Sequence, residues 1–118
     1  MNDFKLPIFN RFYQLIKFLY KITHNMPREY KYNLGEEIID LSWLCLDGAF
    51  KAGYIKGSEK GKEIEKISYN FDCLKLRLRM ASEIGAISDN VYVHLQENYI
   101  IEIGKMIGGW KKWDEEKE

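Results

Sequence analysis

Apolar side chains recur every three or four residues in four separate segments of this chain, and this spacing predicts four amphipathic α-helices. No segment alternates apolar and polar residues as a half-buried strand does. We expect the first helix over 8–25, the second over 33–52 and the fourth over 89–110. The third is expected to start between Lys60 and Lys62 and to end just before Gly85.

Residues with marked preferences for helix ends support these boundaries. Pro7 suits the first turn of the first helix, and Asn33 with Glu36 forms a variant of the capping box at the start of the second. Gly85 fits the left-handed position just past the third helix, and Ser88 fits the N-cap of the fourth. A polar stretch with three glycines is expected to connect the second and third helices flexibly: Gly53, Gly57 and Gly61.

Each predicted helix has one apolar stripe that needs a partner. The third is the widest, and we expect it to be buried against more than one neighbour. An antiparallel arrangement buries all four stripes at once, so the predicted fold class is all-α, an up-and-down four-helix bundle. The stripes are Phe9, Phe12, Ile16, Leu19 and Tyr20; Leu34, Ile38, Leu41, Leu44 and Cys45; Ile64, Ile67, Phe71, Leu74, Leu78 and Ala81, widened by Leu76 and Met80; and Tyr92, Leu95, Tyr99, Ile103, Met106 and Trp110, flanked by Ile100 and Ile107.

The length and composition indicate one folded domain. A chain of 118 residues with 46% hydrophobic and 31% charged residues can bury a core without metal or disulfide support. Net charge is zero, but residues 114–118 sum to −4 + 1 = −3, which leaves +3 on residues 1–113. We expect a bundle over 1–113 and an acidic tail over 114–118. With no signal peptide and no long apolar run, a cytoplasmic location is predicted.

The residues that usually carry catalysis or bind metals are few and scattered. The two histidines, His24 and His94, have no carboxylate or cysteine partner on the same helix face, and surface positions are expected for both. Two cysteines without a metal-binding spacing are expected to be buried reduced thiols: Cys45 and Cys73. Acidic pairs at helical spacing are interpreted as solvated faces: Glu36 with Asp40, and Glu59 with Glu63. We therefore predict no enzymatic activity, no cofactor and no metal site.

Basic side chains and a C-terminal aromatic run are the remaining candidates for function. Clustered cations bind phosphate backbones by charge neutralisation and counterion release. The candidates are Arg11, Lys17 and Lys21, with Arg28 and Lys31 nearby, and Lys75, Arg77 and Arg79 in the third helix. Replacing Lys75 and Arg79 by alanine is predicted to weaken nucleic-acid binding and its salt dependence. Met106 and Trp110 are candidates for subunit contacts, although a Trp110 that closes the bundle is the simpler interpretation.

Several local sequences occur together in one order. They are Pro7–Phe9 leading into Tyr13–Tyr20, Met26–Pro27, Tyr32–Leu34 before Gly35, Leu74–Ala81 with Gly85, Ile87 and Ser88, and, most specifically, Glu102–Trp110. Over nearly the whole chain this order resembles the four-helix bundle proteins that include the accessory variability determinant (Avd) of diversity-generating retroelements. A related branch, encoded in intervening sequences of ribosomal RNA genes, typically has an Asn-Ile-Ala-Glu-Gly-like stretch in its second helix. Residues 44–50 differ from that stretch.

The resemblance implies a function for this bundle. Proteins of this kind form a pentameric barrel that binds the element's reverse transcriptase and its template RNA or cDNA, and so supports mutagenic retrohoming without catalysing it. The six cations proposed for these contacts are Arg11, Lys17, Lys21, Lys75, Arg77 and Arg79. The alternative is an oligomeric adaptor of the ribosomal intervening-sequence branch with an unknown partner. A neighbouring reverse transcriptase gene would favour the first interpretation.

Overall fold

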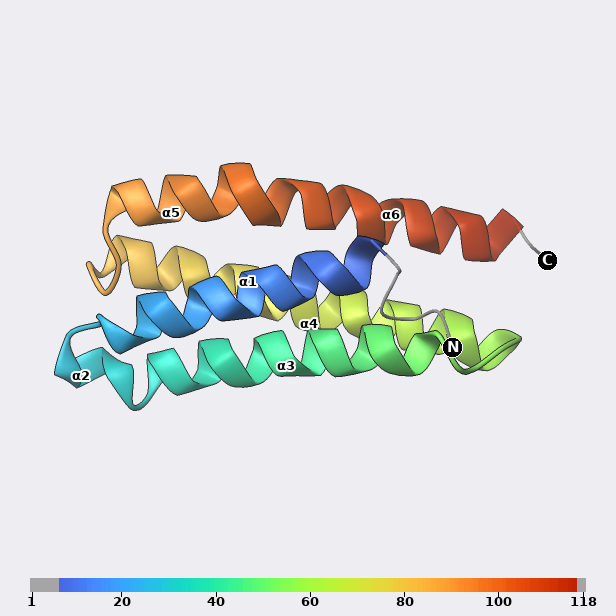
Figure 1. Cartoon of the computed structure of the whole chain (residues 1–118), viewed down its shortest axis with the longest axis horizontal. Coiled ribbons are helices and arrows are strands. Elements are labelled where there is room, and N and C mark those ends of the chain that lie inside the picture. Colours follow the sequence, from blue (N-terminus) through green and yellow to red (C-terminus); the bar gives the residue numbers. More distant parts are fainter. Residues whose placement is uncertain (1–6, 117–118) are drawn as a thin grey trace.

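The computed structural model describes residues 7–116, and they form an antiparallel bundle of four helical rods (Figure 1). The bundle is elongated, with principal extents of 47 × 21 × 21 Å. The predicted all-α four-helix architecture is therefore confirmed. The elements are α1 (Pro7–His24), the short α2 (Arg28–Lys31), α3 (Leu34–Ala52), α4 (Ser58–Glu83), and a fourth rod made of α5 (Asp89–Leu95), the π-helical segment η2 (Gln96–Ile100) and α6 (Ile101–Glu116).

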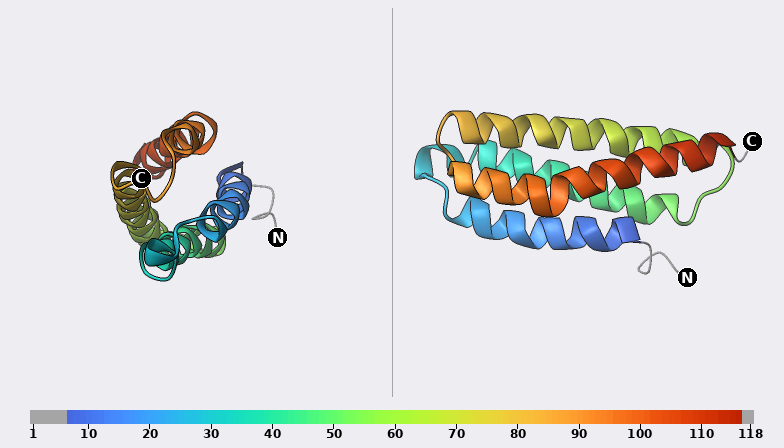
Figure 2. Two further views of the ribbon diagram at one scale, coloured as in Figure 1. Left: turned by 90° about the vertical axis from the view of Figure 1, so that its left-hand side faces the viewer. Right: turned by 90° about the horizontal axis from the view of Figure 1, so that it is seen from above.

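The four rods surround one apolar core. Seen end-on, α3 lies between α1 and α4, and α4 lies between α3 and the fourth rod (Figure 2), while contacts between α1 and α6 complete the bundle. α1 and α4 are thus diagonal to each other. Phe12 and Phe71 meet across this diagonal with ring centroids 5.9 Å apart in an edge-to-face arrangement. Both rings are almost completely buried.

Three of the predicted helix boundaries are confirmed by their hydrogen bonds. Ser88 Oγ accepts from the Val91 N–H at 3.1 Å, as an N-cap does. At the end of α4, Gly85 has φ +79°, and the Ala86 N–H donates to the Ala81 carbonyl at 2.8 Å. This pattern is the Schellman motif, which requires one residue in the left-handed backbone conformation. Glycine adopts that conformation without strain. α3 begins at Leu34, whose N–H donates to the Asn33 side chain.

Other details of the helix ends differ from the prediction. The capping box with Glu36 is wrong, because Asn33 bonds the adjacent N–H instead of the one three residues on. α4 begins at Ser58, before the predicted start, and α2 was not predicted at all. α6 continues to Glu116, so the first three acidic residues after position 113 are helical.

The fourth rod is not the continuous α-helix that was predicted. In η2 the Ile101 N–H donates to the Gln96 carbonyl, five residues back. The extra residue of a π turn rotates everything beyond it around the helix axis. Ile100 and Ile107, which were expected on the flank, are therefore buried, whereas Met106 is only partly buried. The predicted stripe is correct at Leu95 and Ile103, which are fully buried.

Four large side chains expected in apolar stripes are exposed in the single chain. Tyr20 is 49% exposed, Leu44 51%, Leu76 58% and Met80 49%. The reason differs between them. Tyr20 and Leu44 lie at the edges of their stripes, while Leu76 and Met80 face away from the core, on the side of α4 opposite to Leu74 and Leu78. The apolar side chains of α4 therefore lie on two opposite sides of the helix. The bundle core covers the side with Leu74 and Leu78 and leaves the other exposed in the single chain.

Candidate interaction surfaces

The thiols and imidazoles do not come together as a catalytic centre. Cys45 is buried at the α3–α4 packing, where burial and the nearby Cys73 raise the pKa of its thiol to about 12, so it remains a neutral thiol at physiological pH. The prediction of burial is correct for Cys45 and wrong for Cys73, which is half-buried. His24 and His94 are exposed, as predicted, and the His94 ring packs 4.8 Å from that of Phe18. Within residues 7–116 no three side chains are placed to bind a metal.

Two of the predicted contact residues present free charge to solvent. Lys17 and Lys21 are exposed on the outer side of α1, four residues apart, and neither has an ion pair among residues 7–116. Lys17 Nζ lies 5.7 Å from the centre of the Tyr13 ring, which is itself exposed. Lysines without carboxylate partners keep their full charge for an external anion.

Arg11, although on the same helix, is directed toward the fourth rod. Its Nε lies 2.8 Å from Glu102 Oε1, in an ionic rather than a hydrogen-bonding geometry. Its Nη2 donates to the Asn98 carbonyl, within the π segment, and its guanidinium lies 5.2 Å from the centre of the Tyr99 ring. Arg11 is thus placed to hold α1 against η2 and α6.

The three predicted cations of α4 each have a carboxylate partner. Two of them pair within α4: Lys75 Nζ lies 3.2 Å from Asp72 Oδ1, and Arg79 Nε lies 3.0 Å from Glu83 Oε2. Arg77 Nε lies 3.3 Å from Glu37 Oε1 of α3 and links the two helices. Since α1 and α4 are diagonal in the bundle (Figure 2), the six predicted cations are divided between two helices that are not neighbours.

Met106 and Trp110, the predicted subunit contacts, lie beside the start of α1. Both are partly buried against the core, and with Pro7 and Ile8 they line an apolar groove of about 280 Å³. Trp110 therefore packs beside the start of α1, and α6 continues past it to Glu116. The outer side of α4 is a second apolar surface, formed by Tyr69, Leu76 and Met80 at 49–68% exposure. We call these three residues the outer α4 stripe.

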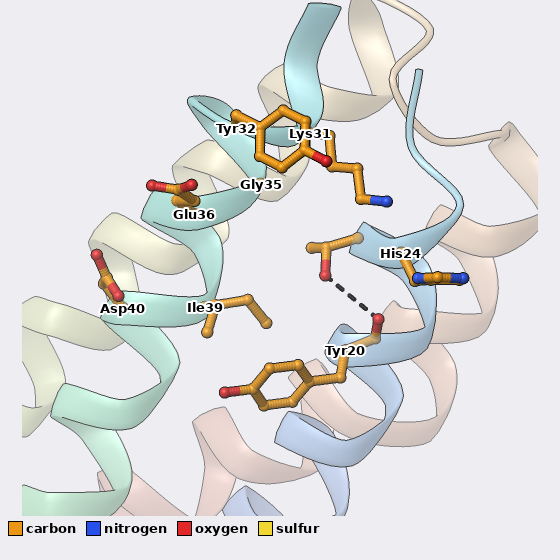
Figure 3. A pocket seen from close by; sticks show the side chains of 9 residues that line it. Tyr20, His24, Lys31, Tyr32, Gly35, Glu36, Ile39 and Asp40 are labelled. Carbon is orange, nitrogen blue, oxygen red and sulfur yellow. Dashed lines mark hydrogen bonds between the residues drawn. The ribbon is translucent and has the colours of Figure 1, made fainter. Parts of the chain in front are cut away.

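A mixed pocket lies at the end of the bundle where α1, α2 and α3 meet (Figure 3). We call it the α1–α3 pocket, and its volume is about 380 Å³. Gly35 contributes to its wall and lets α3 approach α1, because a Cβ there would lie 3.3 Å from the Met26 sulfur and 3.7 Å from Thr23 Cβ. The lining is Tyr20, Thr23, His24, Lys31, Tyr32, Gly35, Glu36, Ile39 and Asp40.

This pocket was not predicted from the sequence. His24 had been assigned to the surface, Glu36 to a cap and Tyr20 to the core, because each was considered on its own helix. The available signal was the concentration of aromatic and charged residues on both sides of Pro27. The tight turn at Pro27 brings those residues together from two antiparallel helices.

Comparison with known proteins identifies a family. The model of a family described as bAvd-like matches residues 6–113. No curated protein and no solved structure matches the chain significantly. In the part of the chain that the structure describes, no helix combines the length and apolarity required to cross a bilayer.

Proposed function

The chain belongs to the bAvd-like family, and from that premise we propose that it is a non-catalytic accessory protein of a diversity-generating retroelement. In this role it binds the element's reverse transcriptase together with template RNA or cDNA and supports mutagenic retrohoming. The family match over residues 6–113 is the observation that carries the proposal. It includes residues of all four helical rods, so it covers nearly the whole bundle and not one local motif.

The ion pairs indicate which of the proposed contact residues contribute most to phosphate binding. Lys17 and Lys21 have no carboxylate partner among residues 7–116, so an incoming phosphate meets two uncompensated charges. The charges of Lys75 and Arg79 are partly neutralised by their ion pairs with Asp72 and Glu83. These α4 ion pairs are exposed and weak, so they can open for a ligand, at a small cost in affinity. We propose that Lys17 and Lys21 contribute most.

The test is fluorescence anisotropy with a labelled single-stranded RNA over a range of salt concentrations. Each phosphate contact on a single strand contributes about −0.7 to the slope of log K against log salt. Lys17→Ala with Lys21→Ala is expected to reduce that slope by about 1.4. The matched control is Lys75→Ala with Arg79→Ala, which removes the same number of charges and is expected to have the smaller effect. Equal binding by all three proteins would contradict a role for either surface.

The adaptor of the ribosomal intervening-sequence branch remains the alternative function. Co-expression with the reverse transcriptase of the same element separates the two proposals. A complex that stays together through size-exclusion chromatography supports the accessory role. No complex with that enzyme, and no RNA binding, would favour the adaptor.

A further inference from the structure

The α1–α3 pocket brings together two aromatic rings, a cationic side and an anionic side. Figure 3 shows Tyr32 and Tyr20 at opposite ends of the pocket, with Ile39 between them. Lys31, whose ammonium group makes one side cationic, lies near His24, whereas Glu36 and Asp40 come from the facing helix α3. A ligand that fits all of these groups has a flat π-face, a negative end and a hydrogen-bond donor at its opposite end.

We propose that the α1–α3 pocket binds one nucleotide whose base carries an exocyclic amino group, supplied by a single-stranded nucleic acid. This inference rests on the proposed function, because it adds a base contact to the phosphate contacts of α1. The pocket volume of about 380 Å³ lies within the range of small-ligand sites.

The tyrosines provide surfaces on which a base can stack. Tyr20 is 49% exposed and Tyr32 is 64% exposed, so ring surface of both is accessible in the single chain. Tyr20 is also held in place: its hydroxyl accepts a hydrogen bond from Trp43 Nε1 at 2.9 Å. Stacking on a ring that is already fixed costs little side-chain entropy, and every base has a π-face.

The cationic side is continuous with the lysines of α1. Lys17, Lys21 and His24 follow one another at helical spacing on the exposed side of α1, and Lys31 extends this line across the turn. Lys31 Nζ lies 5.8 Å from the centre of the Tyr32 ring, so this ammonium group and one stacking surface are adjacent. A strand whose phosphates follow the α1 lysines reaches the pocket with its backbone on the cationic side.

The carboxylates determine which base edge fits the other side. Glu36 and Asp40 are one helical turn apart on α3, and neither has an ion pair among residues 7–116. Ionised carboxylates only accept hydrogen bonds, so they complement an amino group such as N4 of cytosine and repel the O4 carbonyl of uracil. They also repel phosphate, which fixes the orientation of the nucleotide in the pocket.

The indole resonance of Trp43 is a built-in reporter of the pocket, because its N–H is bonded to Tyr20. We would record two-dimensional NMR spectra of ¹⁵N-labelled protein, with the Trp43 signal assigned from Trp43→Phe. The probes are octamers of cytidine, of uridine and of abasic ribose phosphate, and free CMP. The cytidine octamer is expected to shift the Trp43 signal and to bind at least about fivefold more tightly than the abasic octamer. The uridine octamer is expected to bind more weakly than the cytidine octamer.

Tyr20→Leu with Tyr32→Leu is expected to remove the advantage of cytidine over the abasic strand. Tyr54→Leu changes another exposed tyrosine, just past the end of α3 opposite to the pocket, and is the control. CMP shifting the Trp43 signal at the same concentration as the octamer would assign the site to free nucleotides instead of a strand. An unmoved Trp43 signal during RNA binding that still depends on Lys17 and Lys21 would overturn the pocket alone. No binding of any octamer would overturn the proposed function as well.

Discussion

At the scale of single residues, Gly48 sets how closely α3 approaches α4. A Cβ at this position would lie 2.7 Å from Ile67 Cγ1, inside the van der Waals distance, and 3.2 Å from Glu63 Oε2. Ile67 is 1% exposed, so its side chain is surrounded by protein atoms. Gly48→Ala is therefore expected to lower the free energy of unfolding by about 1–2 kcal/mol, since overpacking outweighs the helix propensity that alanine adds.

Gly108 in α6 is the control for this prediction. Nothing lies within 4 Å of a Cβ built on Gly108, so alanine gains helix propensity there without a clash. Gly108→Ala is expected to raise the free energy of unfolding by about 0.5–1 kcal/mol. Urea unfolding monitored by circular dichroism measures both variants. If both alanines stabilise the protein, the proposed contact between α3 and α4 at Gly48 is wrong.

At the scale of elements, Arg11 links α1 to the π segment. It contacts Glu102, the Asn98 carbonyl and the Tyr99 ring, which lie within or just beyond η2. The Arg11 side chain is 29% exposed, and solvent weakens its ion pair with the half-exposed Glu102. We expect Arg11→Ala to cost about 1–2 kcal/mol of stability, mainly through its charged hydrogen bond and lost packing.

The α4 pair of Arg79 with Glu83 provides a matched test of this expectation. The Arg79 side chain is 70% exposed, so Arg79→Ala should change the free energy of unfolding by less than about 0.5 kcal/mol. Both variants lose one arginine from the bundle, so the difference between their urea midpoints isolates the contacts of Arg11. Equal midpoints would show that Arg11 contributes no more than an ordinary surface charge.

The elements also show how far sequence alone can predict this fold. Capping by Ser88 and termination at Gly85 are local events that depend on a few neighbouring residues, and both are confirmed. η2 is different, because an extra residue in one turn leaves the three- and four-residue spacing on each side intact. The contact that accompanies it comes from Arg11, 87 residues away from Asn98 in the chain. Periodicity within one helix contains no information about such a partner.

The candidate site was less predictable for a similar reason. Composition and spacing identified Lys17 and Lys21 as exposed cations. They could not show that Arg11, on the same helix, is instead directed toward Glu102 of the fourth rod. Whether a surface arginine meets solvent or a carboxylate is decided by the neighbouring rod. The α1–α3 pocket depends on three elements at once, so it emerges only when the turn at Pro27 is placed in space.

At the scale of the whole molecule, the outer α4 stripe is the best candidate for a contact between subunits. Tyr69, Leu76 and Met80 expose apolar surface on one side of the longest helix, and buried interface centres are rich in such residues. Met106 and Trp110 pack against the core of their own chain, so replacing them would disturb the fold and association together. We therefore propose that the outer α4 stripe contributes to the subunit contacts of the pentamer that the resemblance to the Avd proteins implies.

Light scattering coupled to size-exclusion chromatography tests this proposal. Five chains of 14.0 kDa give a pentamer of about 70 kDa. Leu76→Lys with Met80→Lys places two charges on the outer α4 stripe, and because burying an unpaired charge is costly, the measured mass is expected to fall toward that of one chain. Val93→Lys with Ile101→Lys changes two side chains of similar exposure, 49% and 51%, on α5 and α6 and should leave the mass unchanged. If the second pair dissociates the assembly and the first does not, subunits meet through the fourth rod, and the outer α4 stripe is left for another partner.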